Sequence, residues 1–155
     1  MPKATGMDLL DSNIFSVDRF FPRDSLYSQN KSFVEKLDSI DAAISSFTLL
    51  EVCGAASFRL SVDELSAWLF TFGAMYPVYV LDVHGVRTTD CEAWWSTFME
   101  EATANIAKKM TFGDAVLLRE AENYDAEAII TWNTKDFVRR TRLTVLSPTA
   151  FLRQH

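Results

Sequence analysis

The chain has 155 residues, a length typical of one domain, and 48% of its residues are hydrophobic while 23% are charged. This composition allows a buried core and excludes a disordered chain, and the few glycines (5) and prolines (4) exclude collagen-like and low-complexity proteins. The net charge of −6 argues against a protein that binds nucleic acid through bulk positive charge. We therefore expect a single domain over residues 1–155.

Cysteine and histidine usage excludes several other classes. Cys53 and Cys91 lie far apart and form no CxxC pair, which argues against a disulfide framework or a cysteine zinc site and favours a reducing compartment. The histidines are His155 and His84, and we expect His84 in a loop or at a strand end. The longest apolar stretch, at 68–81, is shorter than the roughly 20 residues of a membrane span, so no membrane association is expected.

In the first half of the chain, short apolar runs alternate with amphipathic stretches. The segments predicted there are a strand at 7–10, an irregular region at 17–29, a helix at 32–37, a strand at 41–47, a helix at 48–58 and a helix at 61–75. The last two begin with Thr48 and Ser61, each followed three residues later by glutamate, which is the capping-box pattern of a helix start.

The second half continues this alternation. Its predicted segments are a strand at 78–81, a helix at 90–109, a helix capped at Thr111 and running to 122, a strand at 127–131, a cap-like turn at 133–136 and a strand at 143–146. Strands that alternate with helices are typical of an α/β fold with a parallel sheet.

Four acidic residues are predicted to lie at one edge of this sheet. Asp11 ends the first strand, and Glu51 lies in the first turn of the helix after the second strand. Asp136 lies in the first turn of the helix after the fourth strand, and Asp114 begins the helix that leads into that strand. In an open parallel sheet, ligand sites favour the edge where the strands have their carboxyl ends.

Four carboxylates in one cleft require cations, because like charges repel and otherwise keep some of the groups protonated. Oxygen-only ligands favour hard cations such as Mg²⁺ or Mn²⁺, which position a water molecule, lower its pKa and stabilise charge on a transferring phosphoryl group. The alternative is structural, because an acid in the first turn of a helix also interacts favourably with the helix dipole. That alternative applies to Glu51 and Asp114 taken singly.

Four segments resemble, in order, the motifs of PIN-domain nucleases. They are residues 9–15 (LLDSNIF), 45–52 (SSFTLLEV), 112–118 (FGDAVLL) and 129–137 (IITWNTKDF). The similarity continues through the last strand and tail and spans about residues 7–152. Four motifs in the right order, in a chain of family-like size, make the resemblance fairly specific.

The resemblance implies a PIN fold, which is a three-layer α/β/α sandwich with a central parallel sheet of four or five strands. It implies Mg²⁺- or Mn²⁺-dependent hydrolysis of phosphodiester bonds in RNA. It also implies a cytoplasmic VapC-type toxin of a toxin–antitoxin pair, which forms a homodimer and is inhibited by a VapB-type antitoxin. Residues 1–6 precede the usual start of the family and are expected to form a flexible extension.

The family's acidic positions are matched one by one by Asp11, Glu51, Asp114 and Asp136, which are therefore expected to be catalytic and to bind the metal ions. Asn133 stands where many members have an aspartate, so the fourth carboxylate depends on Asp136. Asn133 is then expected to support the site instead.

Further residues are expected to assist the four acids. Asn13 orients Asp11 or caps the next turn, and Thr131 is a second supporting residue. Residues 132–155 contain five basic residues and one acid, so Arg139 and Arg140 are candidates for binding the RNA backbone or an acidic partner. Arg119, five residues after the third acid, is a candidate for facing the cleft. A solvated helix face is the structural alternative for the basic residues.

Two other classes of function stay open at this point. One is a catalytically idle PIN-like module that binds RNA or protein, although such a module has no reason to keep four carboxylates together. The other is a phosphatase of the haloacid type, with an aspartate nucleophile at the end of the first strand. That chemistry requires a second aspartate two residues later, where this chain has Asn13.

Overall fold

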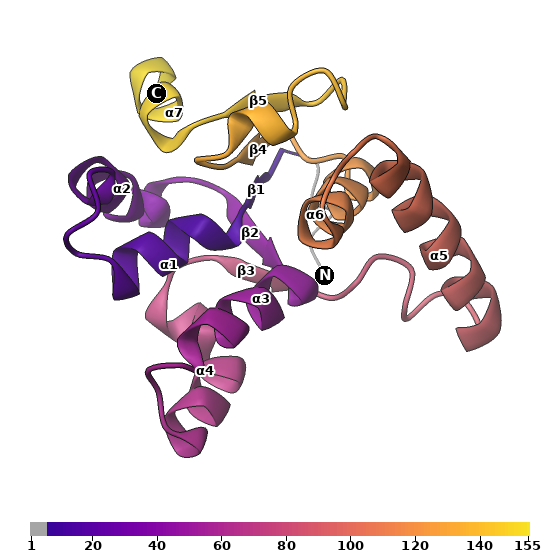
Figure 1. Ribbon diagram of the computed structural model, residues 1–155, viewed down its shortest axis with the longest axis horizontal. Coiled ribbons are helices and arrows are strands. Elements are labelled where there is room, and N and C mark those ends of the chain that lie inside the picture. The colour runs from indigo at the N-terminus through magenta and orange to yellow at the C-terminus, as the bar shows by residue number, and fades with distance from the viewer. Residues whose placement is uncertain (1–5) are drawn as a thin grey trace.

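A computed structural model describes residues 6–155, and its centre is a five-stranded parallel sheet in the order β3-β2-β1-β4-β5 (Figure 1). The strands are β1 (Asp8–Leu10), β2 (Ala42–Ser45), β3 (Tyr79–Leu81), β4 (Ala128–Ile130) and β5 (Thr144–Leu146). Every pairing in the sheet is parallel, which confirms the predicted α/β class. The predicted extension at 1–6 lies outside the described residues except for its last residue.

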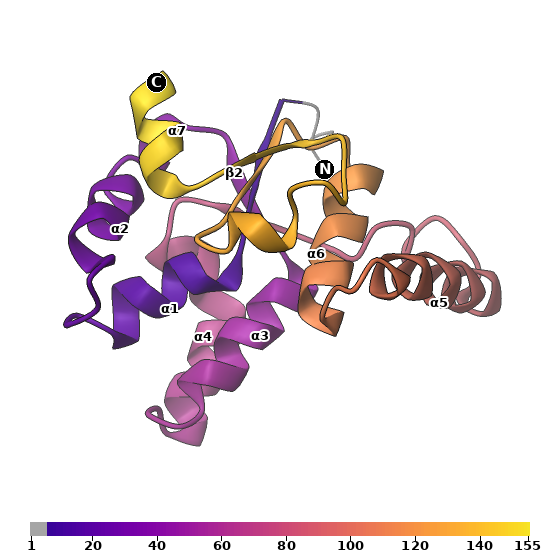
Figure 2. The same cartoon turned by 45° about the horizontal axis from the view of Figure 1, so that its top comes forward.

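Helices cover both faces of the sheet and complete three layers. They are α1 (Ser12–Phe20), α2 (Tyr27–Val34), α3 (Ser46–Ala56), α4 (Val62–Met75), α5 (Cys91–Ala107), α6 (Phe112–Asn123) and α7 (Pro148–Gln154), with single 3₁₀ turns at Leu37–Ser39 and Thr134–Asp136. Figures 1 and 2 show α1–α4 and α7 on one side of the sheet and α6 on the other, with α5 outside α6. None of the helices in residues 6–155 combines the length and apolar character that a membrane crossing requires.

Alternate residues of the central strands face opposite helical layers. Leu10 and Ile130 belong to the apolar cluster on the α1 side, whereas Leu9 and Ile129 belong to the cluster on the α6 side. This follows from the two-residue period of a strand, and it explains why both faces of β1 and β4 carry apolar side chains, with Asp8 at the start of β1 as a buried exception. The two strands are therefore fixed in register at the centre of the molecule.

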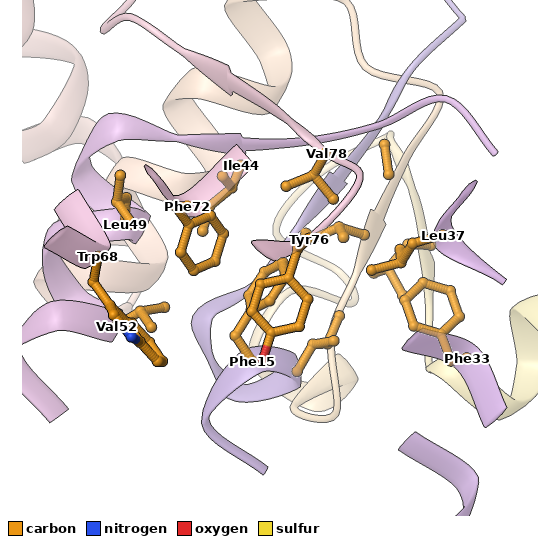
Figure 3. Close-up of a cluster of buried hydrophobic side chains, with 14 of the residues drawn as sticks. Phe15, Phe33, Leu37, Ile44, Leu49, Val52, Trp68, Phe72, Tyr76 and Val78 are labelled. Carbon is orange, nitrogen blue, oxygen red and sulfur yellow. The ribbon is translucent and has the colours of Figure 1, made fainter. Parts of the chain in front are cut away.

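The larger core cluster is built around aromatic side chains, as Figure 3 shows. The ring of Phe15 meets the rings of Phe72 and Tyr76 edge-on, with centroids 5.0 Å apart in both pairs. Burial of a side chain of this size stabilises the fold by about 1.5–3 kcal/mol. The cluster holds α1 and α4 against the sheet and so fixes the segment that follows β1.

The region predicted to be irregular, 17–29, is the largest error of the sequence-based assignment. It contains the second half of α1 and the start of α2, which precedes the helix predicted at 32–37. Helix α1 begins at Ser12 because the Asp11 side chain caps it, accepting a hydrogen bond from the Ser12 amide at 2.6 Å. Its buried face, with Ile14 and Val17 three residues apart, is the signal that predicts a helix there.

Helix α3 begins earlier than predicted. Its cap is Ser45, whose hydroxyl accepts from the Thr48 amide at 3.1 Å, so Thr48 is inside the helix and is not its cap. The strand before it therefore ends at Ser45, and Glu51 lies in the second turn of α3 where the first was predicted. By contrast, α4 has the predicted capping box, with Ser61 and Glu64 bonded reciprocally.

Two smaller differences lie near the end of the chain. The segment Thr134–Asp136 is a single 3₁₀ turn, and Asn133 at its cap position makes no side-chain capping hydrogen bond, so the predicted helix after β4 does not form. Helix α7 was not anticipated, although Ser147 caps it and Pro148 occupies its first position. The cysteines agree with expectation, because Cys53 and Cys91 are both free.

The strand order places a switch point between β1 and β4. From β1 the chain moves outward through β2 to β3, and it then returns to place β4 on the other side of β1. Ligand sites in open α/β sheets lie outside the carboxyl ends of the two strands at such a point. The residues that follow β1 and β4 are Asp11 and Thr131.

Candidate active site at the carboxyl edge of the sheet

Asp11 is the most tightly held of the four predicted acids. It is 5% exposed, and its Oδ1 accepts the hydrogen bond from the Ser12 amide that caps α1. Its Oδ2 accepts from the Thr131 hydroxyl at 2.6 Å and from Asn13 Nδ2 at 2.9 Å. The Thr131 bond joins residues 120 positions apart, so it ties the ends of β1 and β4 together across the switch point.

The predicted supporting residues surround Asp11. Thr131 is fully buried, and its hydroxyl also accepts from Asn13 Nδ2 at 3.1 Å and from the Asn133 amide at 2.9 Å. Asn13 Oδ1 in turn accepts from the Trp132 amide at 3.3 Å. Asn13 and Thr131 therefore contact the acid through their side chains, whereas Asn133 contributes its backbone.

One polar residue behind this network was missed by the sequence analysis. Asn30, from α2, is fully buried, accepts from the Trp132 indole at 2.7 Å and donates to the Ile14 carbonyl at 2.8 Å. Asn30 lies between the segment predicted to be irregular, 17–29, and the helix predicted at 32–37, and a single asparagine there gives no signal of burial. It links α2 to both segments that carry Asp11 and Thr131, which makes their relative position rigid.

Glu51 and Asp114 come together because α3 and α6 lie side by side (Figure 2). The Glu51 carboxylate lies against Gly113, where an added Cβ would be only 2.8 Å from Oε1. Asp114 Oδ2 accepts from the Thr111 hydroxyl at 2.9 Å, and that hydroxyl caps α6. The capping interpretation therefore holds in part for Asp114, while it does not hold for Glu51, which is outside the first turn.

The pKa shifts connect all four carboxyl groups. Burial raises the pKa of Asp11, the Thr131 hydrogen bond lowers it, and the charge of Asp114 raises it again. Burial and the charges of Asp11 and Asp114 also raise the pKa of Glu51. Burial raises the pKa of Asp114, and the charge of Asp136 adds to that effect. Shifts of this kind through shared like charges are typical of functional sites.

No basic side chain forms an ion pair with these acids within residues 6–155, where the ion pairs involve Arg87 and Arg119. The nearest compensation is Arg140, whose charge lowers the pKa of Asp114. Its guanidinium is directed at backbone carbonyls, including that of Asp136 at 2.8 Å. The carboxylates thus carry negative charge that the protein itself leaves largely unbalanced.

The donor set fits a hard cation by its chemistry, since all the side-chain ligands on offer are oxygens. In the described part of the chain, however, no three His, Cys, Asp or Glu side chains are already arranged to hold an ion. Mg²⁺ keeps several of its waters and is commonly bound through one or two carboxylates, so a preformed set of three is not required.

A basic depression lies next to the acids. It has a volume of about 520 Å³, and its lining contains four basic residues and one acid, which are Arg139, Arg140, Arg142, Lys108 and Glu122. Arg139 lies in the loop between the 3₁₀ turn and β5. Its backbone φ is 73°, a value that residues other than glycine rarely adopt. The two arginines predicted to bind phosphate or an acidic partner are therefore neighbours at this surface.

The expectation that Arg119 faces the cleft is wrong. It is 3% exposed, its Nη1 lies 2.5 Å from Glu120 and its Nε lies 2.7 Å from Glu101 of α5, while its guanidinium lies 5.1 Å from the centre of the Phe98 ring. Five helical residues rotate a side chain by about 140°, so Arg119 cannot share the face of Asp114. His84 is in the predicted loop after β3, and its amide donates to Glu120 at 2.8 Å.

Comparison with known proteins gives matches in structure only. No protein-family model matches this sequence, and no curated protein is similar enough to count as a relative. The crystal structure of FitAcB from Neisseria gonorrhoeae has 16% identity and a TM-score of 0.61, and the match covers 92% of this chain and 98% of that one.

Two further solved structures have the same architecture. VapBC-1 from nontypeable Haemophilus influenzae matches with 19% identity and a TM-score of 0.61, over 92% of this chain and 98% of that one. VapBC2 from Rickettsia felis, bound to a DNA fragment from its promoter, matches with 19% identity and a TM-score of 0.59, over 91% of this chain and 98% of that one. Likeness at this level of identity establishes the fold, and the chain therefore has the PIN-like fold that its four motifs predicted.

Proposed function

We propose that this chain is a Mg²⁺- or Mn²⁺-dependent endoribonuclease of the VapC type, the toxin of a type II toxin–antitoxin pair. The observation that carries the proposal is the group of four acids near the switch point. Neighbouring acids raise the pKa of Asp11, Glu51 and Asp114, and no ion pair within residues 6–155 involves any of the four. The likeness to VapBC structures over more than nine-tenths of the chain supports the toxin assignment.

Each residue has a role that its surroundings support. Asp11, Asp114 and Asp136 would hold the metal ions, directly or through water, and Asn13 and Thr131 keep Asp11 in one orientation. When bound, the ions would lower the pKa of a water molecule and stabilise negative charge on the phosphoryl oxygens.

Glu51 is suited to orient the attacking water or to assist a second ion. As a base it would accept the proton of that water while the water oxygen bonds to phosphorus and the 3′-oxygen leaves with its bonding electrons. Burial and neighbouring acids raise the pKa of Glu51, which brings it nearer to the range in which a carboxylate acts as an efficient base. The products would carry a 5′-phosphate and a 3′-hydroxyl.

The test is cleavage of total RNA with Mg²⁺ or Mn²⁺ and with EDTA. We expect discrete cleavage that EDTA abolishes and that Asp11→Asn and Asp114→Asn each reduce by about 100-fold or more. Asp38→Asn, at an exposed aspartate outside the site, is the matched control. Cleavage that survives both site variants, or products with 2′,3′-cyclic ends, would contradict the proposal.

The catalytically idle PIN-like module is the second candidate. The observation in its favour is that, among residues 6–155, no three metal-binding side chains are already grouped. Calorimetric titration of the wild-type protein with Mn²⁺ separates the two functions. Binding that Asp114→Asn abolishes supports the nuclease, whereas no binding and no cleavage support the idle module.

Partners follow from the same proposal. We expect an RNA substrate, a VapB-type antitoxin, a homodimer and a cytoplasmic location. The basic depression at Arg139 and Arg140 provides a surface for the RNA backbone or for an acidic segment of the antitoxin. If Arg139→Glu left RNA binding and its salt dependence unchanged, the RNA role of this surface would be wrong.

A further inference from the structure

A second depression lies beside the carboxylates, between α3 and α6. It has a volume of about 360 Å³, and its apolar lining comes from Phe47, Leu50, Phe112 and Val116. Leu50 is 54% exposed and Phe112 is 58% exposed, so two large apolar side chains face solvent next to the most polar part of the molecule. The volume is at the lower end of the range of about 300–1,000 Å³ that is usual for small-molecule pockets.

This depression is continuous with the candidate active site. Its lining includes Glu51, which is one of the four acids, and Gly113, which directly precedes Asp114 in α6. Gly113 allows the close approach, because an added Cβ there would be 2.8 Å from Glu51 Oε1 and would push the carboxylate away. A molecule in the depression therefore contacts the group that we assign to the attacking water.

The chemistry of the lining favours a flat, apolar ligand whose edge carries N–H donors. Glu51 is the one charged residue in the lining, so a phosphate group is repelled there, while an N–H donor can bond to the carboxylate. Phe47 stacks on Phe98 with centroids 5.3 Å apart and an interplanar angle of 25°, and Phe98 stacks on Trp94 at 5.3 Å and 20°. This stack holds one aromatic wall in place before a ligand arrives.

We propose that this depression binds an unpaired nucleobase of the RNA substrate, next to the phosphodiester bond that is cleaved. The proposal rests on the proposed nuclease function and adds a recognition site to it. Bases of single-stranded RNA stack on aromatic side chains and are read through their polar edges, and both features are present here. Phe112 and Phe47 supply the rings, and Glu51 accepts from the edge of the base.

The two depressions together accommodate a strand of RNA. Both lie near the first turn of α6, because Gly113 lines the apolar one and Arg140, whose charge acts on Asp114, lines the basic one. Phosphates of the strand can therefore contact the arginines while a base next to the cleaved bond enters the apolar depression. An apolar side chain of a protein partner is a poorer occupant, because it offers no donor to the Glu51 carboxylate in the lining of the depression.

Binding of two RNA probes in EDTA tests the proposal directly. One is a fluorescein-labelled single-stranded decamer, and the other has the same ribose–phosphate backbone without bases. We expect the wild-type protein to bind the base-bearing decamer about 10-fold more tightly, Phe112→Ala to lose most of that preference and Phe112→Tyr to keep it. Phe58→Ala, at a phenylalanine that is 91% exposed and outside the depression, should leave the preference unchanged.

Two results would overturn the base site. If Phe112→Ala bound both decamers as the wild-type protein does, a protein side chain would be the remaining occupant. If Phe58→Ala lost the preference to the same extent as Phe112→Ala, the effect would not come from the depression.

Metal-dependent cleavage is measured on the same proteins and separates the two proposals. A wild-type protein that prefers the base-bearing decamer and cleaves no RNA contradicts the nuclease function and supports the base site. A protein that cleaves RNA with the expected metal dependence, equally well in the wild type and in Phe112→Ala, supports the nuclease function and overturns the base site.

Discussion

Two groups of carboxylates, each with one buried member, differ in how the protein balances their charge. One contains Glu120 of α6 and Glu101 of α5, and the other contains Asp11, Glu51 and Asp114. Glu120 is fully buried, but Arg119 pairs with it and the His84 amide donates to it. Asp11 is almost as buried at 5% exposure, and its partners are a backbone amide, an amide side chain and two hydroxyls, none of which carries a positive charge.

This difference separates a structural ion pair from a site that requires an ion. In the Arg119 group, which we call the complete group, the protein itself supplies a cation to the buried carboxylate of Glu120, and the same guanidinium joins α5 to α6 through Glu101. The Asp11 group is held rigidly by hydrogen bonds but keeps an excess of negative charge, which costs free energy of folding unless a cation compensates it. We infer that the first group serves stability and that the second serves chemistry.

Removal of the cation from the complete group should have the largest effect on stability. Arg119→Met keeps most of the side-chain volume but leaves Glu120 buried without its positive partner, so we expect a loss of about 3–5 kcal/mol in the free energy of unfolding. Urea unfolding measures it. Arg87→Met removes an exposed pair with Asp82 and should cost much less stability than Arg119→Met, because solvent screens the pair. Equal losses in the two variants would refute the contrast.

Addition of a cation to the incomplete group should have the next largest effect. At a Mg²⁺ concentration about 100 times its Kd, we expect stabilisation by about 2.7 kcal/mol, which corresponds to about 5–10 °C in Tm for a chain of this size. Thermal unfolding in Mg²⁺ and in EDTA measures the shift. Asp114→Asn should remove it, while Glu101→Gln in the other group should keep it. The same shift in all three proteins would indicate a general salt effect.

Loss of the hydroxyl that orients Asp11 should reduce activity without a comparable loss of stability. Thr131→Val removes the donor to Asp11 Oδ2 and keeps the side-chain shape, so we expect metal affinity or cleavage to fall by about 10–100-fold. Thr131→Ser keeps the hydroxyl and should keep most of the activity. Equal losses in the two variants would mean that packing, and not the hydrogen bond, is responsible.

Asp8, at the other end of β1, is a third buried carboxylate, and its contribution to stability depends on pH. Burial and the charge of Glu127 raise the pKa of Asp8 from 3.8 to about 6. Because the folded protein holds this proton more tightly than the unfolded chain, the contribution to stability is complete below pH 3.8 and is lost as the pH rises through 6. In Asp8→Asn the free energy of unfolding should therefore change with pH by about 1–2 kcal/mol less than in the wild-type protein. Denaturant unfolding between pH 4 and 7 measures this dependence, and parallel profiles would contradict the assignment.

The sequence predicts the fold well where the structure depends on local signals. Helix α4 begins at Ser61 as predicted because its capping box lies within four residues. The start of α3 was misplaced because Ser45 and Thr48 are both good caps, and the end of β2 in the sheet decides between them. The sequence pattern does not predict α1, because Asp11 marks the end of a strand and also caps the helix that follows it.

In the candidate site, too, local sequence signals predict some features, while others depend on how distant segments pack. The proximity of Asp11, Glu51 and Asp114 follows from their places at strand ends and helix starts, and the structure brings them together. The hydrogen bond from Thr131 to Asp11 depends on the order of the strands, which one sequence does not reveal. The burial of Arg119 depends on how α5 packs on α6, and that packing has no local signal.

The long separation between β1 and β4 has a consequence for synthesis. A ribosome adds about 5–20 residues per second, so Thr131 leaves the ribosome about 6–24 seconds after Asp11, from which it is 120 residues away. During that time the emerging chain lacks β4, and the hydrogen bond that fixes Asp11 cannot form. A nascent chain with the proposed activity would thus have no assembled site with which to cut the messenger RNA from which it is still being translated.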